Sequence, residues 1–331
     1  MNILITGGAG GIGSTLCIEL MKNHNVIALD DLSHGYLENL GVNGRLVCEF
    51  ISEDIRNTES MTKHFKDNKI DVVVHLAALT SLPECESNPM ECLSVNVAGT
   101  ASVLKAANDA GVKRVIVAST SAIYEGNKPI ESPFNEDLIV SPSLFYPLSK
   151  KLMEDVIDSY IDNYSMDIVT LRFFNVFGPR QDVHRKSPPL MNYIVKQFAK
   201  QEPCTFYSTG KQQRDYVHVD DVVDLIEICL SNARAKNKIY NVCSGTLTSV
   251  NDVVSYAIQA FGEFEYTFKP SKEFWSDYNL KLSKDAIDRE VNKFSLGSCA
   301  KAMWELGWKP NKDIQKLMVE TMKQNYELIT R

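Results

Sequence analysis

Asn2-Ile3-Leu4-Ile5-Thr6-Gly7-Gly8-Ala9-Gly10-Gly11-Ile12-Gly13 is the stretch of the chain that decides its fold. A short β-prone run leads into a helical pattern, and three glycines between them have the spacing GxxGxxG. A strand that turns this tightly into a helix leaves no room for Cβ atoms, and the helix N-terminus offers N–H groups to a pyrophosphate. The stretch therefore predicts a dinucleotide site made of Gly7, Gly10, Gly11, Ile12 and Gly13.

A carboxylate follows these glycines at the distance that a dinucleotide site requires. The next apolar run ends at Asp30, about 20 residues further along, where a carboxylate can accept hydrogen bonds from an adenosine ribose. A negative charge at this place disfavours a 2′-phosphate, so we expect NAD as the cofactor and not NADP. Asp31 is the next residue, and it either joins Asp30 at the ribose or is solvated.

The first half of the chain alternates short β-rich runs with helical patterns, which predicts a parallel sheet covered on both faces. We therefore expect an α/β fold with a doubly wound parallel sheet (Rossmann) over residues 1–176. Residues 177–331 are expected to form a smaller, discontinuous α/β substrate domain, from which about residues 214–245 return to the first domain. The predicted strands are 2–6, 26–29, 46–50, 72–75, 114–118, 168–173 and 239–242, and the predicted helices are 12–22, 60–66, 89–110, 147–164, 222–230, 250–261 and 314–328.

The composition excludes several classes of protein. The formal net charge of -7 argues against nucleic acid as a partner, because binding to phosphate backbones needs clustered Lys and Arg. No apolar run approaches the roughly 18 residues of a membrane helix, so no membrane partner is expected. The eight cysteines include no CxxC pair and most lie in apolar stretches, which favours reduced thiols in a cytoplasmic protein over a zinc site.

Tyr146-Pro147-Leu148-Ser149-Lys150 contains a YxxxK pair, whose two polar side chains lie on one face of a helix. A tyrosine with a pKa near 10 is a poor base at neutral pH, but a neighbouring ammonium group and the positive nicotinamide ring of NAD both favour the phenolate. Tyr146 is therefore a candidate general base and Lys150 its partner, and both would contact the cofactor. Thr120 and Ser121 follow a predicted strand, at the sheet edge where open parallel sheets bind their ligands.

These motifs resemble the short-chain dehydrogenases and, over nearly the whole chain, their extended branch, the NAD-dependent epimerase/dehydratase family. The segments that carry the resemblance are Asp54-Ile55, His75-Leu76-Ala77-Ala78, Asn96-Val97-Ala98-Gly99-Thr100, Leu171-Arg172-Phe173-Phe174-Asn175-Val176-Phe177-Gly178-Pro179-Arg180 and Gln213-Arg214-Asp215-Tyr216-Val217-His218. The resemblance implies further cofactor-binding residues, with Asp54 and Ile55 at the adenine. The others that it implies are Leu76, Ala77, Ala78, Asn96 and Phe173.

The same resemblance implies a nucleotide-sugar substrate. Thr120 stands at the place of the family's catalytic Ser/Thr, whose hydroxyl binds the substrate oxygen that Tyr146 deprotonates. Asn175 and Arg214 are similar to the residues that hold the diphosphate, because a guanidinium matches phosphate in a bidentate manner. Arg289 is a second, weaker candidate for that role. The implied substrate-binding residues are Thr80, Ser81, Thr120, Ser121, Asn175, Arg214, Arg289 and Ser295.

Members of this family oxidise a sugar hydroxyl with NAD, and the 4-keto sugar then follows one of several routes. Dehydratases and decarboxylases carry a Glu two residues after the catalytic Thr, where this chain has Ala122. A 4-epimerase needs no acid there, because the ketone turns over and takes the hydride back on its other face. The sequence therefore favours a nucleotide-sugar 4-epimerase over a dehydratase or decarboxylase. A non-catalytic NAD-binding relative is the remaining alternative, but such a protein has no need of Tyr146.

Two further expectations rest on the resemblance alone. In similar 4-epimerases a residue near position 295 forms a wall of the sugar pocket, and a small residue there, such as Ser295, admits UDP-N-acetylhexosamine besides UDP-hexose. Family members also commonly form homodimers by pairing two helices into a four-helix bundle, which are here the helices predicted at 89–110 and 147–164.

Overall fold

The computed structural model describes residues 1–126, 133–276, 278, 280, 282–283, 285–286, 294–311 and 313–330. Within these residues, no helix combines the length and the apolar character that crossing a membrane requires. A search of the same residues finds no group of three or more His, Cys, Asp or Glu side chains placed to hold a metal ion. All eight cysteines are free thiols.

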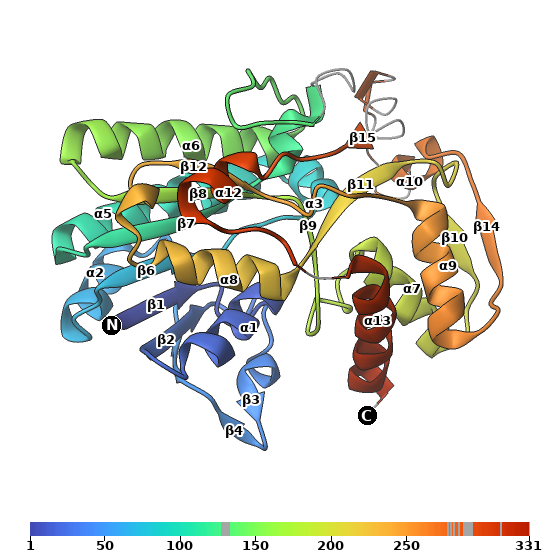
Figure 1. The fold of residues 1–331 in the computed structure, drawn as a ribbon, viewed down its shortest axis with the longest axis horizontal. Helices are drawn as coiled ribbons and strands as arrows, with labels where there is room; N and C mark the ends of the chain where they lie inside the picture. Colours follow the sequence, from blue (N-terminus) through green and yellow to red (C-terminus); the bar gives the residue numbers. More distant parts are fainter. Residues whose placement is uncertain are drawn as a thin grey trace.

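In the described part of the chain, seven strands form a parallel sheet in the order β12-β8-β7-β6-β1-β2-β5 (Figure 1). The chain builds outward from β1 through β2 to β5, and then crosses to the other side of β1 for β6, β7 and β8. In such sheets ligands bind at the carboxyl ends of the strands where this reversal occurs. The strands are β1 (Asn2–Thr6), β2 (Asn25–Asp30), β5 (Glu49–Ser52), β6 (Val72–His75), β7 (Arg114–Thr120), β8 (Ile168–Phe173) and β12 (Ile239–Val242).

Helices cover both faces of this sheet, which confirms the predicted doubly wound α/β fold. On one face, Leu16 of α1 and Val222 of α8 share a buried cluster with Ile5 of β1. On the other face, Leu104 of α5 shares a cluster with Leu4. Neighbouring residues of β1 thus point to opposite layers, and both layers are apolar. The covering helices are α1 (Gly11–Leu20), α2 (Thr58–Asp67), α5 (Thr100–Ala110), α6 (Phe145–Tyr164) and α8 (Val219–Cys229).

Two predicted elements are divided in the structure. The strand predicted at 46–50 is wrong in its bounds, because Asn43 and Gly44 adopt positive φ angles of 51° and 76° and turn β3 (Gly41–Val42) back onto β4 (Arg45–Leu46) before β5 begins. The helical stretch predicted at 89–110 is confirmed in its bounds, but a π-helical turn at Ser94–Gly99 divides it into α4 (Pro89–Leu93) and α5. A π-helical turn widens the helix locally, and such turns are frequent at functional sites.

The second half of the chain forms a smaller layer beside the sheet, at the right of Figure 1. Its core joins Ile194, Phe206, Val254 and Met322, which come from α7, β10, α9 and α13. Helix α7 lies in the proline-flanked segment where no helix was predicted. β12 and α8 also come from the second half of the chain, but they pack with the sheet formed mainly by the first half. The domain boundary at residue 176 stays a prediction. The remaining elements are α3 (Leu82–Ser87), β9 (Asn175–Phe177), α7 (Leu190–Lys200), β10 (Cys204–Phe206), β11 (Gln213–His218), β13 (Leu247–Ser249), α9 (Val250–Phe261), β14 (Tyr266–Phe268), α10 (Lys272–Ser276), β15 (Phe294–Ser295), α12 (Ala300–Leu306) and α13 (Ile314–Thr330).

A buried ion pair ties α6 to the sheet beneath it. Arg172 of β8 donates to both carboxylate oxygens of Glu154 of α6, at 3.0 and 2.8 Å, and the Ser119 hydroxyl of β7 donates to the same carboxylate at 2.6 Å. The side chains of the pair are 6% and 4% exposed. Arg172 also donates to the Tyr124 hydroxyl at 2.8 Å. Because water does not reach these charges, removing one of them leaves the other buried without compensation.

We therefore predict that Glu154→Gln lowers the free energy of unfolding by about 3–5 kcal/mol, because the Arg172 guanidinium loses its counter-charge in a buried site. Urea denaturation of the purified protein measures the change. Glu19→Gln is the matched control, since it makes the same exchange in α1, where Glu19 pairs with Lys22 at the surface. Exposed pairs contribute about 0–1 kcal/mol, so equal shifts for the two variants would contradict the importance given to the buried pair.

Candidate active site

The first of two adjoining cavities lies at the carboxyl ends of the strands, around the turn from β1 to α1, and has a volume of about 560 Å³. Side chains do not fit in this turn. A Cβ on Gly7, whose φ is +69°, would lie 2.7 Å from the Ala77 nitrogen, and a Cβ on Gly13 would overlap the Gly7 carbonyl oxygen. The predicted cofactor residues that line the cavity are Gly7, Gly10, Gly11, Ile12, Gly13, Asp30, Asp31, Asp54, Ile55, Leu76, Ala77, Ala78, Tyr146, Lys150 and Phe173.

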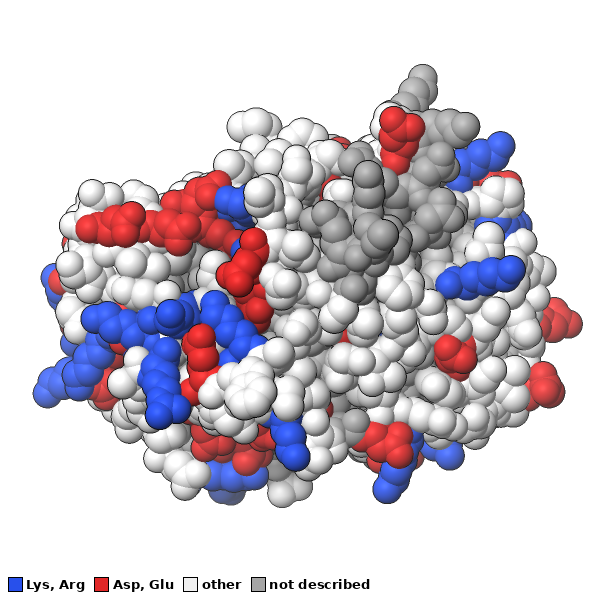
Figure 2. All heavy atoms as spheres, turned by 45° about the horizontal axis from the view of Figure 1, so that its top comes forward, with Lys and Arg blue, Asp and Glu red and all other residues white. Residues whose placement is uncertain are grey.

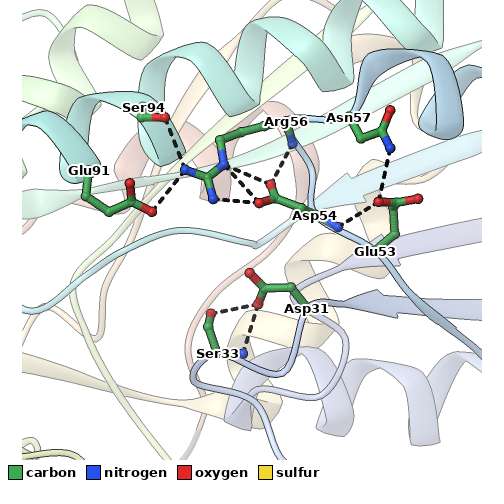
Figure 3. A network of polar contacts seen from close by, with 8 residues as sticks. All are labelled: Asp31, Ser33, Glu53, Asp54, Arg56, Asn57, Glu91 and Ser94. Atoms are coloured by element: carbon green, nitrogen blue, oxygen red, sulfur yellow. Dashed lines mark hydrogen bonds and ion pairs between the residues drawn. The ribbon is translucent and has the colours of Figure 1, made fainter.

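Asp30 ends β2 with its carboxylate turned toward the glycine turn. One of its oxygens accepts a hydrogen bond from the Ala9 nitrogen at 3.1 Å, and the other accepts one from the Leu32 nitrogen at 2.9 Å. Burial raises the pKa of this carboxyl. Each oxygen keeps a second lone pair, so the group can still accept from ribose hydroxyls. Asp31, in contrast, is exposed and accepts from the Ser33 nitrogen and hydroxyl at 2.9 and 2.6 Å (Figure 3).

A guanidinium at the rim of the first cavity joins the end of β5 to α4. Arg56 donates to the two oxygens of Asp54 at 2.6 to 3.0 Å, to Glu91 at 2.9 Å and to the Ser94 hydroxyl at 3.2 Å (Figure 3). Its hydrogen bonds hold the pKa of Asp54 below the ordinary value. The Asp54 carboxylate is therefore paired with Arg56, while Ile55 contributes apolar surface that an adenine could contact.

Buried polar side chains fix the wall behind the first cavity. Asn96, in the π-helical turn, is not among the lining residues, and its amide instead accepts from the Leu79 nitrogen at 2.8 Å and donates to the Leu79 carbonyl at 2.9 Å. His75 lies 2.7 Å from the Thr6 hydroxyl and 2.9 Å from that of Thr100. Burial lowers the pKa of His75 to about 3, so its ring is neutral. Both residues position strand ends, and a contact of Asn96 with the cofactor stays a prediction.

The three predicted catalytic residues meet in the first cavity. Thr120 is the last residue of β7, and Tyr146 and Lys150 lie one turn apart near the start of α6. Burial raises the pKa of Tyr146 to about 12, and a hydrogen bond with Thr120 acts in the opposite direction. The Lys150 ammonium donates to the Ala118 carbonyl at 3.0 Å, and burial lowers its pKa to about 8. A positive charge added beside the phenol would lower its pKa.

A second cavity, of about 880 Å³, adjoins the first and shares part of its wall. Thr80, Thr120, Tyr146 and Arg185 line both cavities, so a ligand in either one reaches the hydroxyl groups of Thr120 and Tyr146. Arg289 lies outside the described residues. The other candidate substrate residues all line this cavity, and they are Thr80, Ser81, Thr120, Ser121, Asn175, Arg214 and Ser295.

Strand β11 gathers the substrate candidates that lie far apart in the sequence. Its Arg214 is the Cα partner of Ser295 in β15, and its far end pairs with β9, which begins at Asn175. The Asn175 amide donates to the Asp215 carbonyl at 3.0 Å. The Asp215 carboxylate accepts from the Ser244 nitrogen at 2.8 Å, and burial raises its pKa to about 6. These contacts hold the floor of the second cavity in place.

Sequence reasoning missed the loop between β9 and α7, residues 178–189. Three of its residues, Gln181, Arg185 and Pro189, line both cavities. No periodicity marks such residues, and the one available signal was an arginine in a proline-rich stretch directly after the family-like segment. The aromatic side chains of the second cavity were missed as well, and these are Tyr193, Phe206, Tyr207, Tyr216, Phe274, Trp275 and Tyr278.

Comparisons with known proteins identify the family and the fold of the chain. The NAD dependent epimerase/dehydratase family matches residues 3–243. The chain is 32% identical to a putative UDP-glucose 4-epimerase of Methanocaldococcus jannaschii, over 98% of this chain and 99% of that protein. It is 29% identical to a dTDP-D-glucose 4,6-dehydratase of Bos taurus, over 98% and 89%. The crystal structure of UDP-glucose 4-epimerase from Thermotoga maritima with UDP-glucose matches with a TM-score of 0.87 and 28% identity, over 99% and 100%.

A match over most of the chain, to a family whose cofactor suits the first cavity, supports one conclusion: the chain belongs to the NAD-dependent epimerase/dehydratase family and is an NAD-dependent enzyme.

Proposed function

We propose that this enzyme is a nucleotide-sugar 4-epimerase that acts through a transient 4-keto sugar. The observation that carries the proposal is the wall that the two cavities share, in which Thr120 and Tyr146 both lie. A sugar held in the second cavity reaches the Tyr146 phenol from one side, and the NAD cavity lies on the other side. A hydroxyl of that sugar could therefore lose its proton to Tyr146 at the same place where the carbon that bears it would lose a hydride to NAD.

The residues of the shared wall have distinct parts in this reaction. The chemistry that bound NAD would supply is to take up a hydride from C4 of the sugar and to return it later. Tyr146 takes the proton of the O4 hydroxyl as the ketone forms, and gives it back to O4 after the ketone has turned over. The Thr120 hydroxyl hydrogen-bonds the same phenol and orients it toward the substrate oxygen. Lys150, one turn further along α6, lines the NAD cavity, and the Ala118 carbonyl holds its ammonium group.

The lining of the second cavity favours epimerisation over loss of water. Elimination needs an acid that protonates the departing hydroxyl group. Ala122 occupies the place where the family's dehydratases carry such an acid, and it lines this cavity. Among the described lining residues there is no Asp or Glu. This observation supports a 4-epimerase, although a dehydratase is among the relatives of similar length.

The same lining supports a uridine nucleotide that carries a hexose or an N-acetylhexosamine. Arg214 supplies a positive charge for the diphosphate, and the aromatic side chains provide apolar surface for a base. Two UDP-glucose 4-epimerases are among the similar proteins, which supports uridine as the base. Ser295 is small and lines this cavity, so it leaves space for an N-acetyl group on the sugar.

We also propose a homodimer that forms through α4, α5 and α6. Met90 of α4 and Leu152 and Tyr164 of α6 are large hydrophobic residues that are 75%, 38% and 56% exposed. Figure 2 shows a row of acidic side chains at the upper left of the molecule, where α6 lies in Figure 1. Like charges near a two-fold axis repel their symmetry copies, and salt screens this repulsion. The exposed acidic residues of α6 are Asp155, Asp158 and Asp162.

Tyr146→Phe should lower the turnover of UDP-glucose and UDP-N-acetylglucosamine by about 10²- to 10⁴-fold, because the variant has no proton acceptor at O4. NMR detection of the 4-epimer measures turnover, and calorimetric titration with NAD checks that the cofactor still binds. Tyr160→Phe is the matched control, since Tyr160 lies on the same helix and donates to the Ala101 carbonyl, away from both cavities. Near-normal turnover in Tyr146→Phe would overturn the assignment of the base.

Ser295→Tyr should reduce kcat/KM for UDP-N-acetylglucosamine far more than for UDP-glucose, because the added ring fills the space left for the acetyl group. Ser295→Ala, which keeps the residue small, should leave the ratio of the two values unchanged. If Ser295→Tyr changes both substrates equally, Ser295 is not the wall next to the acetyl group.

Light scattering at micromolar concentration should give twice the chain mass of 37.2 kDa, and the dimer should weaken as salt is removed, because the acidic rows then repel without screening. A monomer at every salt concentration would exclude the proposed interface.

A further inference from the structure

The loop between β9 and α7 holds Arg185 in a fixed position. The Arg185 nitrogen donates to the Asp182 carboxylate at 3.1 Å, and the Lys196 ammonium donates to the Arg185 carbonyl at 3.2 Å. Asp182 in turn accepts from the Tyr36 hydroxyl at 3.2 Å, so the loop is tied to the segment after β2. The side chain of Arg185 therefore starts from an anchored backbone, which reduces the entropy that ligand binding costs.

The protein satisfies only part of the hydrogen-bonding capacity of the Arg185 guanidinium. Its Nη1 lies 3.4 Å from the Thr80 hydroxyl, at the limit of a hydrogen bond, and its Nε is buried without a hydrogen-bond partner. Within the described residues, no carboxylate lies within ion-pair distance of it. Buried donors in native proteins are nearly always paired, so an unpaired guanidinium nitrogen at the wall of two cavities points to a ligand.

The guanidinium belongs to the reacting end of the second cavity. Arg185 shares the wall between the cavities with Thr80, Thr120 and Tyr146, and its charge acts to lower the pKa of the Tyr146 phenol. Arg180 of the same loop lies elsewhere, because its guanidinium donates to the Thr15 hydroxyl of α1 at 3.0 Å, beside the glycine turn.

The charges of the second cavity are all of one sign in its described lining, which contains Arg185, Lys186 and Arg214 and no carboxylate. Arg214 is the residue proposed for the diphosphate, and Lys186 does not line the NAD cavity. A nucleoside diphosphate with a neutral sugar would leave the positive charge next to Tyr146 without a counter-charge. A negative charge on the sugar ring itself would supply one.

We propose that Arg185 binds a carboxylate on the sugar, so that the preferred substrates are nucleoside diphosphate sugars whose sugar is acidic. The inference rests on the proposed function. It adds a preference for acidic over neutral sugars, which is separate from the effect of Ser295 on acetylated and plain sugars. A planar guanidinium and a planar carboxylate form two parallel hydrogen bonds, and a neutral hydroxymethyl group cannot replace both.

The test compares four probes: UDP-glucose, UDP-N-acetylglucosamine, UDP-glucuronate and UDP-N-acetylglucosaminuronate. For the wild-type enzyme, kcat/KM for each acidic sugar should exceed that of its neutral counterpart by roughly 10- to 100-fold, the range expected for hydrogen bonds to charged groups. Arg185→Gln should remove this preference. Arg185→Lys keeps the charge but cannot form two parallel hydrogen bonds, so it should retain part of the preference. Ser295→Tyr should change only the ratio of acetylated to plain sugars.

Lys186→Gln is the matched control, because Lys186 is a neighbouring cation of the same cavity but not of the shared wall. It should change acidic and neutral sugars by the same factor. Calorimetric binding of UDP-glucuronate and UDP-glucose to the wild-type holoenzyme provides a readout that needs neither turnover nor a folded variant, and the acidic ligand should bind more tightly.

Several results would overturn the role of Arg185. Equal binding and equal kcat/KM for acidic and neutral sugars in the wild-type enzyme would do so while leaving the 4-epimerase proposal intact. So would an Arg185→Gln variant that loses NAD affinity, or one that shifts the pH profile equally for all four sugars, since the residue would then serve the cofactor or Tyr146. Preferential binding of the acidic ligand without any 4-epimer, or its conversion to a pentose, would support the carboxylate site and contradict epimerisation.

Discussion

The turn from β1 to α1 closes only because it carries no side chains, and the rest of the site depends on this closure. A Cβ on Gly13 would overlap the Gly7 carbonyl oxygen, and one on Gly7 would meet the backbone after β6. With the turn closed, the Ala9 nitrogen reaches the Asp30 carboxylate, and the carboxyl ends of β1, β2 and β6 share one edge of the sheet. The same backbone constraint thus shapes the NAD cavity and determines from which side a second ligand can approach.

The chemistry depends on how Tyr146 is placed and on what surrounds it. Helix α6 is held onto β7 and β8 by the buried Glu154–Arg172 pair, one turn beyond Lys150. Burial raises the pKa of the Tyr146 phenol to about 12, while the hydrogen bond with Thr120 and the charge of Arg185 act in the opposite direction, as a positive charge in the adjoining cavity would.

Much of the fold, and the grouping of Thr120, Tyr146 and Lys150 at one cavity, could be predicted because local patterns encode them. The glycine spacing, the apolar strand runs and the Tyr146–Lys150 pair each need only a few consecutive residues. Features that depend on distant contacts could not be predicted. The π-helical turn that buries Asn96 and helix α7 between prolines have no periodic signal of their own. Arg185 matters only because its loop folds over two cavities formed by other segments.

The central claim is that one carbon of the sugar is oxidised and then reduced at the same place on its opposite face. A UDP-sugar labelled with deuterium at C4, followed by NMR with the purified holoenzyme, tests this most directly. The account predicts that the product has the inverted configuration at C4 and still carries the deuterium there. Deuterium found at another carbon, or lost from a product with a different number of oxygens, would contradict it.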